Sequence, residues 1–390
     1  MLVGWPKSLN EVMTNLRRMS TAGFLWAGII FGSALAHADQ PPWNRHVIDG
    51  SLRGADGVRL ADFNRDGLLD IVTGWEESGV VRLYLNPGAK KSKMAWPAVT
   101  VGESRSPEDA VAFDVDGDGT LEVISCHEGK SRRVMVHRSS DQTQLLSIDR
   151  WESKTIKPLD GQAWMFAEPI VINDKPALTV GAKGSNGTIS LAIPNGNSWS
   201  TRKLRDAGWI MTLKALDMDG DGDQDLVYSD RKGPNRGVGW LEQPRNSEMS
   251  WRDHTIGGSD AEVMFMDSRV DQMFVATRGA NVLQFSKADT GWKRSKIENP
   301  SGVRFGKAVR RFGKSGFVFT ANTAADKQQD LPGIWLREDG NWQAIDLTTN
   351  VKPDRIEVLD LDQDGDLDVL TCEERRNLGV IWYENPSKSQ

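Results

Sequence analysis

The chain has 390 residues, enough for two average domains or for one large all-β domain. Its formal net charge is −6 and no run of basic residues stands out, which argues against binding to nucleic acid. It contains 15 tryptophans but only 3 tyrosines, an unusual balance between two aromatic residues.

The N-terminal segment is predicted to be an export signal. Two arginines precede the apolar run AGFLWAGIIFGSALA (22–36), and AHA at 36–38 fits the small-x-small cleavage rule. We therefore expect a signal peptide of residues 1–38, cleavage after Ala38, and a secreted or periplasmic protein of residues 39–390. The apolar run is short for crossing a bilayer, so we expect no membrane span after cleavage; a retained anchor is the alternative.

Four acidic loops follow along the chain, at 62–70, 114–122, 217–225 and 360–368. They read DFNRDGLLD, DVDGDGTLE, DMDGDGDQD and DLDQDGDLD, so each has side-chain oxygens at positions 1, 3, 5 and 9 and a glycine at position 6. Carboxylates this close repel one another unless a cation lies among them, and the pattern matches the first nine positions of a calcium-binding loop.

These loops differ from EF-hands in two ways. An EF-hand has a bidentate Glu at position 12 and a helix on each side, whereas position 12 here is Thr, Ser or Tyr and the flanks read as strands. We predict up to four structural Ca²⁺ sites in strand–loop–strand hairpins; for any single loop, a plain acidic turn is the alternative. The predicted ligands are Asp62, Asn64, Asp66, Asp70, Asp114, Asp116, Asp118, Glu122, Asp217, Asp219, Asp221, Asp225, Asp360, Asp362, Asp364 and Asp368.

Strands that begin with tryptophan recur seven times, at spacings of 41 to 55 residues. A period near 50 with several short strands in each unit is typical of β-propeller blades. We therefore predict an all-β fold, a seven-bladed propeller of four-stranded blades that occupies residues 39–390. The copies are WNRHVI at 43, WPAVTV at 96, WESKTI at 151, WSTRKL at 199, WRDHTI at 251, WKRSKI at 292 and WQAIDL at 342.

The two ends of the repeat region complement each other. The first tryptophan strand, 43–48, has no earlier strand of its own repeat, and the last repeat, roughly 355–384, stops after its third strand. We predict that strand 43–48 completes this last blade, because the pairing closes the ring and removes an open sheet edge.

The acidic loops, each followed by a short apolar strand at a period near 50, resemble the FG-GAP/VCBS repeat family of calcium-binding β-propellers. The resemblance covers about residues 45–385 and implies the propeller fold and structural calcium. Members include integrin-like ligand-binding heads, fungal lectins and the propeller parts of polysaccharide lyases. The segments WNRHVI and WYENP are also similar to the propeller domain of fungal aldos-2-ulose dehydratases, but their histidine-bearing metal site is not evident here, because the first repeat reads GADGV.

The candidate ligand face lies opposite the acidic loops. In a propeller, the loops between strands two and three and the segments leading into strand one share one face, and here they combine both charge signs with tryptophans. Aromatic faces with planar arginines and carboxylates suit sugars, although a solvated rim of ion pairs is the alternative. The predicted ligand-binding residues are Trp75, Glu76, Glu108, Asp109, His127, Trp164, Lys183, Trp209, Asp230, Arg231, Lys232, Glu262, Arg278, Lys307, Asn322, Arg355, Glu373 and Arg375.

Signals for catalysis are few. No nucleophile motif, phosphate loop or zinc spacing is present. Among the histidines of residues 39–390, only His127 lies in a loop of the candidate face. Adjacent carboxylates could do acid–base work, but neighbours along a strand point to opposite sides, so at most one of each pair faces the channel. The catalytic candidates are His127, Glu128, Glu76 and Glu373.

Our leading hypothesis is an exported, calcium-stabilised, monomeric propeller that binds a carbohydrate or another polar ligand on the face opposite the calcium loops. One alternative is a polysaccharide lyase or sugar dehydratase that uses the same face. Another is an integrin-like protein-binding scaffold, which predicts a broad exposed apolar patch. Cys126 and Cys372 follow equivalent loops of different repeats, so two buried thiols are favoured over a disulfide.

Overall fold

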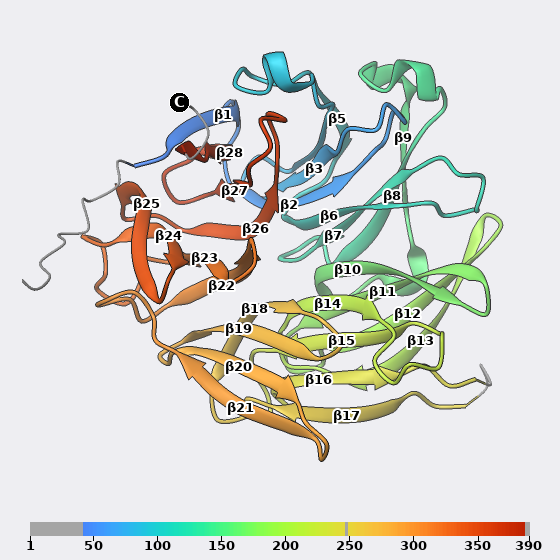
Figure 1. Ribbon diagram of the computed structural model, residues 1–390. Coiled ribbons are helices and arrows are strands. Elements are labelled where there is room, and N and C mark those ends of the chain that lie inside the picture. Colours follow the sequence, from blue (N-terminus) through green and yellow to red (C-terminus); the bar gives the residue numbers. More distant parts are fainter. Residues whose placement is uncertain (1–41, 246–248, 387–390) are drawn as a thin grey trace, which may run out of the picture. The chain divides into compact units, whose positions relative to one another are not determined.

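The computed structural model describes residues 42–245 and 249–386. In this part of the chain, 28 strands form seven antiparallel sheets of four strands each. The sheets are arranged around an axis as the blades of a propeller (Figure 1). The predicted all-β, seven-bladed fold is therefore confirmed. The predicted signal peptide, residues 1–38, lies outside the described residues.

Six blades each use four consecutive strands, and the first strands of neighbouring blades contact one another around the ring. Blades 1 to 4 consist of β2 (Ala55–Ala61), β3 (Asp70–Trp75), β4 (Val80–Tyr84) and β5 (Ala98–Glu103); β6 (Pro107–Phe113), β7 (Glu122–His127), β8 (Arg133–Ser139) and β9 (Trp151–Thr155); β10 (Ala163–Ile172), β11 (Lys175–Lys183), β12 (Thr188–Asn195) and β13 (Ser198–Asp206); and β14 (Ile210–Leu216), β15 (Asp225–Asp230), β16 (Gly237–Glu242) and β17 (Arg252–Gly257). Blades 5 to 7 consist of β18 (Glu262–Ser268), β19 (Gln272–Arg278), β20 (Val282–Lys287) and β21 (Trp292–Ile297); β22 (Gly306–Phe312), β23 (Gly316–Ala321), β24 (Pro332–Glu338) and β25 (Asn341–Thr349); and β26 (Pro353–Leu359), β27 (Asp368–Glu373), β28 (Gly379–Glu384) and β1 (Asn44–Asp49).

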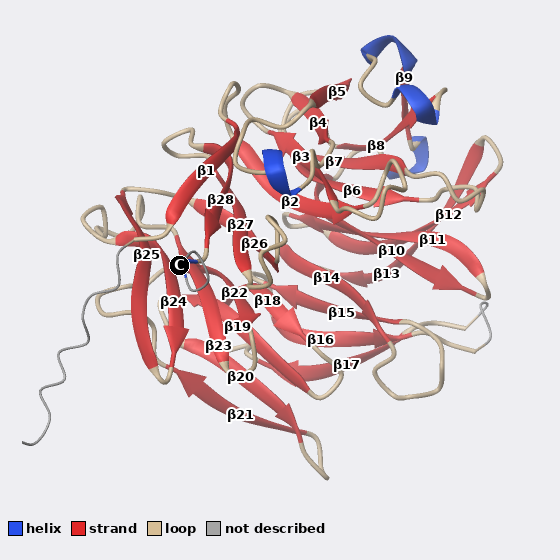
Figure 2. Cartoon of the chain, turned by 45° about the horizontal axis from the view of Figure 1, so that its top comes forward, coloured by secondary structure: helices blue, strands red, loops and turns tan. Residues whose placement is uncertain are grey.

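The described helices are all short and lie in loops between strands (Figure 2). No helix of the described residues has the length and apolar character that a membrane crossing requires. The helices are η1 (Ala89–Lys91), η2 (Gln142–Gln144), η3 (Ile148–Arg150) and η4 (Lys157–Leu159).

The ring closes in blade 7 as the sequence predicts. The N-terminal β1 pairs antiparallel with β28, with His46 opposite Trp382 and Asn44 opposite Glu384. In Figure 1 the blue strand β1 accordingly lies beside the red strand β28. His46 Nε2 lies 2.8 Å from Glu384 Oε2, so a polar side-chain contact reinforces the closure.

The hydrophobic core lies between neighbouring blades. Second strands such as β3, β7, β15 and β27 are buried along their whole length, whereas fourth strands such as β9 and β17 carry exposed residues. Between blades 7 and 1, for example, Ile48, Trp75 and Trp382 pack in one cluster. Cys126 and Cys372 are both free and buried in such clusters, which confirms the preference for two thiols.

Every first strand contains a β-bulge close to its start. In β6, the partners of Pro107 and Asp109 are adjacent residues of β7, so Glu108 between them has no partner of its own. The same break in register occurs in β2, β10, β14, β18, β22 and β26. A bulge re-aims the side chain of the extra residue, and here all seven bulges lie at the end of the axis opposite the acidic loops.

Candidate functional site

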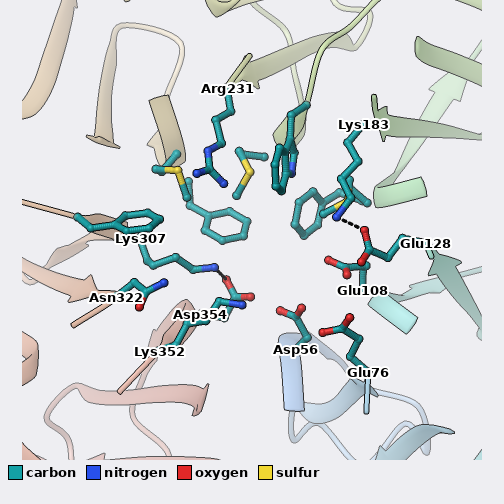
Figure 3. Close-up of a pocket in the computed structure, with 17 residues that line it drawn as sticks. Asp56, Glu76, Glu108, Glu128, Lys183, Arg231, Lys307, Asn322, Lys352 and Asp354 are labelled. Atoms are coloured by element: carbon teal, nitrogen blue, oxygen red, sulfur yellow. Dashed lines mark ion pairs between the residues drawn. The ribbon is translucent and has the colours of Figure 1, made fainter. Parts of the chain in front are cut away.

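The bulged ends of the first strands surround a cavity of about 310 Å³ on the axis (Figure 3). Its walls come from the starts of first strands and from the loops after second strands, which is the face predicted to bind ligand. All seven blades contribute. The lining residues are Asp56, Glu76, Glu108, Glu128, Met165, Phe166, Lys183, Trp209, Met211, Arg231, Met264, Phe265, Phe305, Lys307, Asn322, Lys352 and Asp354.

The bulges explain much of this lining. Because each extra residue is released from the strand ladder, its side chain can turn toward the axis. The residue types at these positions then give each wall its chemistry, apolar on blades 3 to 5 and charged on blades 2, 6 and 7. The bulge residues that line the cavity are Glu108, Met165, Met211, Met264, Phe265, Lys307 and Asp354.

Charged side chains occupy the axis next to the cavity. Arg59 Nη2 lies 2.9 Å from Asp109 Oδ2, and Arg59 Nη1 lies 3.4 Å from Glu168 Oε2. Arg355 lies 4.0 Å from the other oxygen of Asp109, and burial beside Arg59 lowers the pKa of Arg355 to about 10. Asp109 and Arg355, both predicted to bind ligand, therefore belong to this ion-pair network and not to the cavity lining.

Acidic side chains from blades 1 and 2 meet on one side of the cavity. Oxygens of Glu76, Glu108 and Glu128 all lie within 4.8 Å of one another. Burial raises the pKa of Glu108 to about 7. Asp56 is fully enclosed and hydrogen-bonded to Asp354, and burial together with that second carboxyl raises the pKa of Asp56 well above its usual range. This wall can hold a proton or a cation.

The cations of the cavity each contact an acid. Lys183 pairs with Glu128, a contact marked in Figure 3, and burial lowers the pKa of Lys183. The remaining pairs are Arg231 with Glu262 at 2.5 Å, Lys307 with Asp354 at 3.4 Å, and Lys352 with Glu374.

Trp209 provides an aromatic surface at the cavity wall. The charged groups of Lys183, Arg231 and Lys232 lie 4.6, 4.5 and 4.8 Å from its ring centroid. Its buried Nε1–H has no hydrogen-bond partner among the described residues, and neither has Oδ1 of Asn322, a side chain that is only 8% exposed. One donor and one acceptor are thus free to bind a ligand or water.

The structure brings together part of the predicted ligand set. Glu128, named above as a catalytic candidate, lines the cavity too, and Nζ of Lys232 lies over the ring of Trp209. Glu262 and Arg278 instead line a neighbouring surface hollow of about 540 Å³. The predicted ligand-binding residues in the cavity wall are Glu76, Glu108, Lys183, Trp209, Arg231, Lys307 and Asn322.

Other predicted residues stabilise the fold around the cavity. Trp75 and Trp164 are core side chains whose indole N–H groups donate to Tyr84 Oη at 2.9 Å and to the carbonyl oxygen of Leu159 at 2.5 Å.

Asp230 and Glu373 accept backbone hydrogen bonds. Asp230 accepts from the amides of Gly208 and Trp209, and Glu373 accepts from several loop amides, including that of Arg375 at 2.9 Å. Arg375 itself is exposed and does not line the cavity.

His127 is fully buried and does not line the cavity. Its Nδ1 lies 3.0 Å from the carbonyl oxygen of Arg105, which only accepts, so Nδ1 carries the proton. Nε2 of His127 therefore accepts from Ser125 Oγ, and Ser125 accepts from Nε2 of His137, each at 2.7 Å. Nδ1 of His137 then accepts from Ser153. Burial lowers the pKa of His127 to about 4 and that of His137 to about 3, so both rings are neutral.

Several lining residues were not predicted from the sequence. Their signal was the position of strand one along the channel, which marks Asp56, Phe166 and the bulge residues. The remaining two lie in the segments just before strand one. The lining residues outside the predicted ligand-binding and catalytic sets are Asp56, Met165, Phe166, Met211, Met264, Phe265, Phe305, Lys352 and Asp354.

The acidic loops lie at the other face, between the first and second strands of blades 1, 2, 4 and 7. In each, the amide of the glycine at position 6 donates to the carboxylate at position 1, at 2.8 to 3.1 Å. In three of the loops, three carboxylates offer oxygens within 4.8 Å of one another, as in Asp217, Asp219 and Asp225. An all-oxygen donor set of this kind suits a calcium ion.

The carboxylate at position 9 is buried in all four loops. In Asp225, one oxygen accepts from the amide of Met218 and the other from the amide of Gln243, both at 2.8 Å. Asp70 and Asp368 make the corresponding contacts in their blades. Burial raises the pKa of Asp368 to about 7, and a neighbouring cation would favour its ionised form.

Comparison with known proteins identifies relatives by sequence and by fold. A family model described as FG-GAP-like repeat matches residues 62–125, which include the first two acidic loops. Cartilage acidic protein 1 of Mus musculus is 27% identical over 188 residues, which are 47% of this chain and 22% of that protein. The chain thus spans about a fifth of the length of this curated relative.

Two solved structures share the fold at low identity. Virginiamycin B lyase from Staphylococcus aureus is 11% identical and superposes with a TM-score of 0.53, covering 87% of this chain and 97% of the lyase. Sqt1 from Saccharomyces cerevisiae is 10% identical with a TM-score of 0.51, covering 86% of this chain and 97% of Sqt1. At these identities the likeness concerns the fold alone.

Proposed function

We propose that this chain, a seven-bladed β-propeller of the FG-GAP repeat family, binds a carbohydrate or a similarly polar small ligand in its axial cavity. The observation that carries the proposal is the combination of Trp209 with the unpartnered Asn322 in one cavity wall. A sugar ring presents C–H groups that pack on an aromatic face and hydroxyls that donate and accept hydrogen bonds.

The size of the cavity supports a small ligand. Its volume of about 310 Å³ is near the lower end of the range for small-molecule sites, about 300–1,000 Å³. A second void, of about 20 Å³ and lined in part by Phe265 and Arg355, is too small for a ligand. A ligand would enter and leave through the mouth between the loops.

We also propose that the four acidic loops bind calcium and that residues 1–38 direct export. Calcium in the loops would hold the inner hairpins of blades 1, 2, 4 and 7 by neutralising carboxylates that otherwise repel one another. The buried position-9 side chains, such as Asp225, would connect each ion to the end of the third strand through the backbone contacts described above.

Isothermal titration calorimetry with a panel of neutral, acidic and amino sugars tests the carbohydrate proposal. We expect Trp209→Phe to keep the aromatic face, to lose the indole donor and to weaken binding roughly threefold to tenfold, the value of one hydrogen bond. Trp199→Phe, a half-buried tryptophan on the outer strand β13, is the matched control and should bind normally. Absence of binding across the panel would contradict the proposal.

A sugar lyase or dehydratase is the second candidate, favoured by one observation. Glu108 is enclosed at the cavity wall with its pKa raised to about 7, near the value that suits a general base at neutral pH. Since His127 is enclosed in the core, Glu108 would be the residue that removes a proton next to a carbonyl or carboxyl group. Ultraviolet absorbance of an unsaturated product, lost in Glu108→Gln, tests this candidate.

The protein-binding alternative has less support among the described residues. Large exposed apolar side chains are distributed over the blades and do not gather on one of them. They are Val47, Leu69, Met94, Leu146, Ile148, Val171, Met249, Val270 and Leu347.

A further inference from the structure

The cavity lining contains more carboxyl groups than cationic groups. Each of its four cations contacts one acid, as described above for Lys183, Arg231, Lys307 and Lys352. These pairs use Glu128 and Asp354 from the lining and two acids from outside it. Three carboxyl side chains of the lining therefore have no cationic partner among these pairs.

The three remaining acids are Asp56, Glu76 and Glu108. Within the described residues, no Lys, Arg or His nitrogen lies within 4.0 Å of their carboxyl oxygens. Asp56 and Glu108 are only 5% and 7% exposed, and Figure 3 shows all three side chains pointing to the same part of the cavity. Oxygens of Glu76 lie within 4.8 Å of oxygens of both Asp56 and Glu108.

Carboxylates that are buried close together without a cation are unfavourable. They either take up protons or pair with a positive group from outside. A ligand that carries a positive charge would supply that group and would make charge-assisted hydrogen bonds to these carboxyls.

A second observation in the same cavity points to a ligand. Asn322 is more than nine-tenths buried, lines the cavity, and has an amide oxygen without a hydrogen-bond partner among the described residues. Figure 3 shows its side chain on the wall across from Glu76. A ligand that reaches both walls must therefore carry a donor for Asn322 as well as a positive group for the acids.

We infer that the ligand is an amino sugar, with its protonated amine among Asp56, Glu76 and Glu108 and a hydroxyl donating to Asn322. This inference rests on the proposed carbohydrate function. An ammonium group has three N–H donors for three carboxyls. The ring carbons would contact the apolar wall of the cavity, which includes Met211, Met264 and Phe305.

An ammonium ion fits this wall better than a divalent metal. Lys183 and Lys352 are near enough to lower the pKa of Glu108, so a doubly charged ion would be repelled more strongly than a singly charged one. A calcium ion also needs six to eight oxygen ligands, whereas the shared contacts here involve three carboxyls at a time.

Calorimetric titration of the purified protein with glucosamine, glucose, N-acetylglucosamine and glucuronic acid tests the inference. We expect glucosamine to bind roughly tenfold or more tightly than the other three, since they lack a positive amine. Glu76→Gln should lower the ratio of the glucosamine affinity to the glucose affinity toward one. Glu77→Gln is the matched control, because Glu77 is exposed and pairs with Arg53 at the surface.

The outcomes separate this inference from the proposal on which it rests. Equal or tighter binding of glucose or glucuronic acid would overturn the amine preference but support a carbohydrate site. No binding of any sugar would refute both. Binding of Mn²⁺ or Ca²⁺ that is lost in Glu76→Gln but kept in Asp219→Asn, without amine binding, would show a metal site instead. Melting temperatures of the variants close to that of the parent protein exclude misfolding as the cause.

Discussion

Glu108 is the bulge residue of β6 and its carboxyl lies in the cavity, while the next residue, Asp109, pairs with Arg59 beside the axis. Trp75 and Glu76 differ in the same way. Trp75 ends a buried strand and packs in the core, whereas Glu76 begins the following loop and lines the cavity. At this scale, one step along the chain separates a side chain that stabilises the fold from one that can contact a ligand.

The chain of hydrogen bonds through Ser125 leads to a prediction about stability. Ser125→Ala would leave Nε2 of His127 without a donor and Nε2–H of His137 without an acceptor, both in the core. We expect a loss of about 2 kcal/mol in the free energy of unfolding, measured by urea denaturation. Ser200→Ala, at an exposed position of β13, is the control and should change little. Equal stability of the two variants would contradict the proposed tautomers.

The same histidines lead to a prediction about pH. Their pKa values in the folded protein, about 4 and about 3, lie below the unfolded value of about 6.5. Their contribution to stability is therefore complete above pH 6.5 and is lost as the pH falls from 6.5 to about 3, because the unfolded chain takes up protons first. Proton NMR should show no titration of His127 or His137 between pH 7.5 and 5. A midpoint near 6.5 for either ring would refute this assignment.

At the scale of elements, the first two strands of blades 1, 2, 4 and 7 form a hairpin with an acidic loop at one end and a bulge at the other. Its acidic loop is tied to the third strand by the buried carboxylate at position 9, and its bulge opens toward the cavity at the other end. The acidic loops and the candidate ligand site therefore share strands but not residues.

Calcium binding gives an element-scale prediction. Asp219 is at position 3 of its loop, where the side chain would be a ligand, whereas Asp223 is at position 7, where the backbone carbonyl would be. Asp219→Asn should remove one ion from the bound stoichiometry and lower the melting temperature in calcium. Asp223→Asn makes the same change of charge and should keep every site. Calorimetric titration distinguishes the two, and identical stoichiometries would count against the loop assignment.

The elements were more predictable from the sequence than the cavity. Tryptophan strands and acidic loops recur at a nearly fixed period, so the repeat pattern alone is enough to assign strand 43–48 to the last blade. Strand alternation cannot locate Met165 or Met211, because the bulge breaks the two-residue period at these positions. The sequence also cannot show that His127 is enclosed by a neighbouring strand and loop while Glu128 is not.

For the whole molecule, closure of the ring depends on a single N-terminal strand. β1 contributes the outer edge of blade 7 and a buried cluster residue, Ile48, between blades 7 and 1. Without it, β28 would present unpaired backbone groups to solvent.

This dependence can be tested by truncation. Removal of residues 1–49 should lower the melting temperature and cause self-association through the exposed edge of β28, seen by light scattering. Removal of residues 1–41 keeps β1 and is the control, which should remain stable and monodisperse. A truncated chain without β1 that melts and sediments like the control would refute the role of this strand in closure.

The seven bulges also affect how this protein can change over evolutionary time. A bulge residue such as Met211 or Lys307 faces the cavity without holding a rung of the backbone ladder. Mutation there alters the chemistry of the cavity wall while the sheets, the acidic loops and the ring closure stay intact. Homologous propellers can therefore acquire new ligands by drift at about one position in each blade, with little loss of foldability on the way.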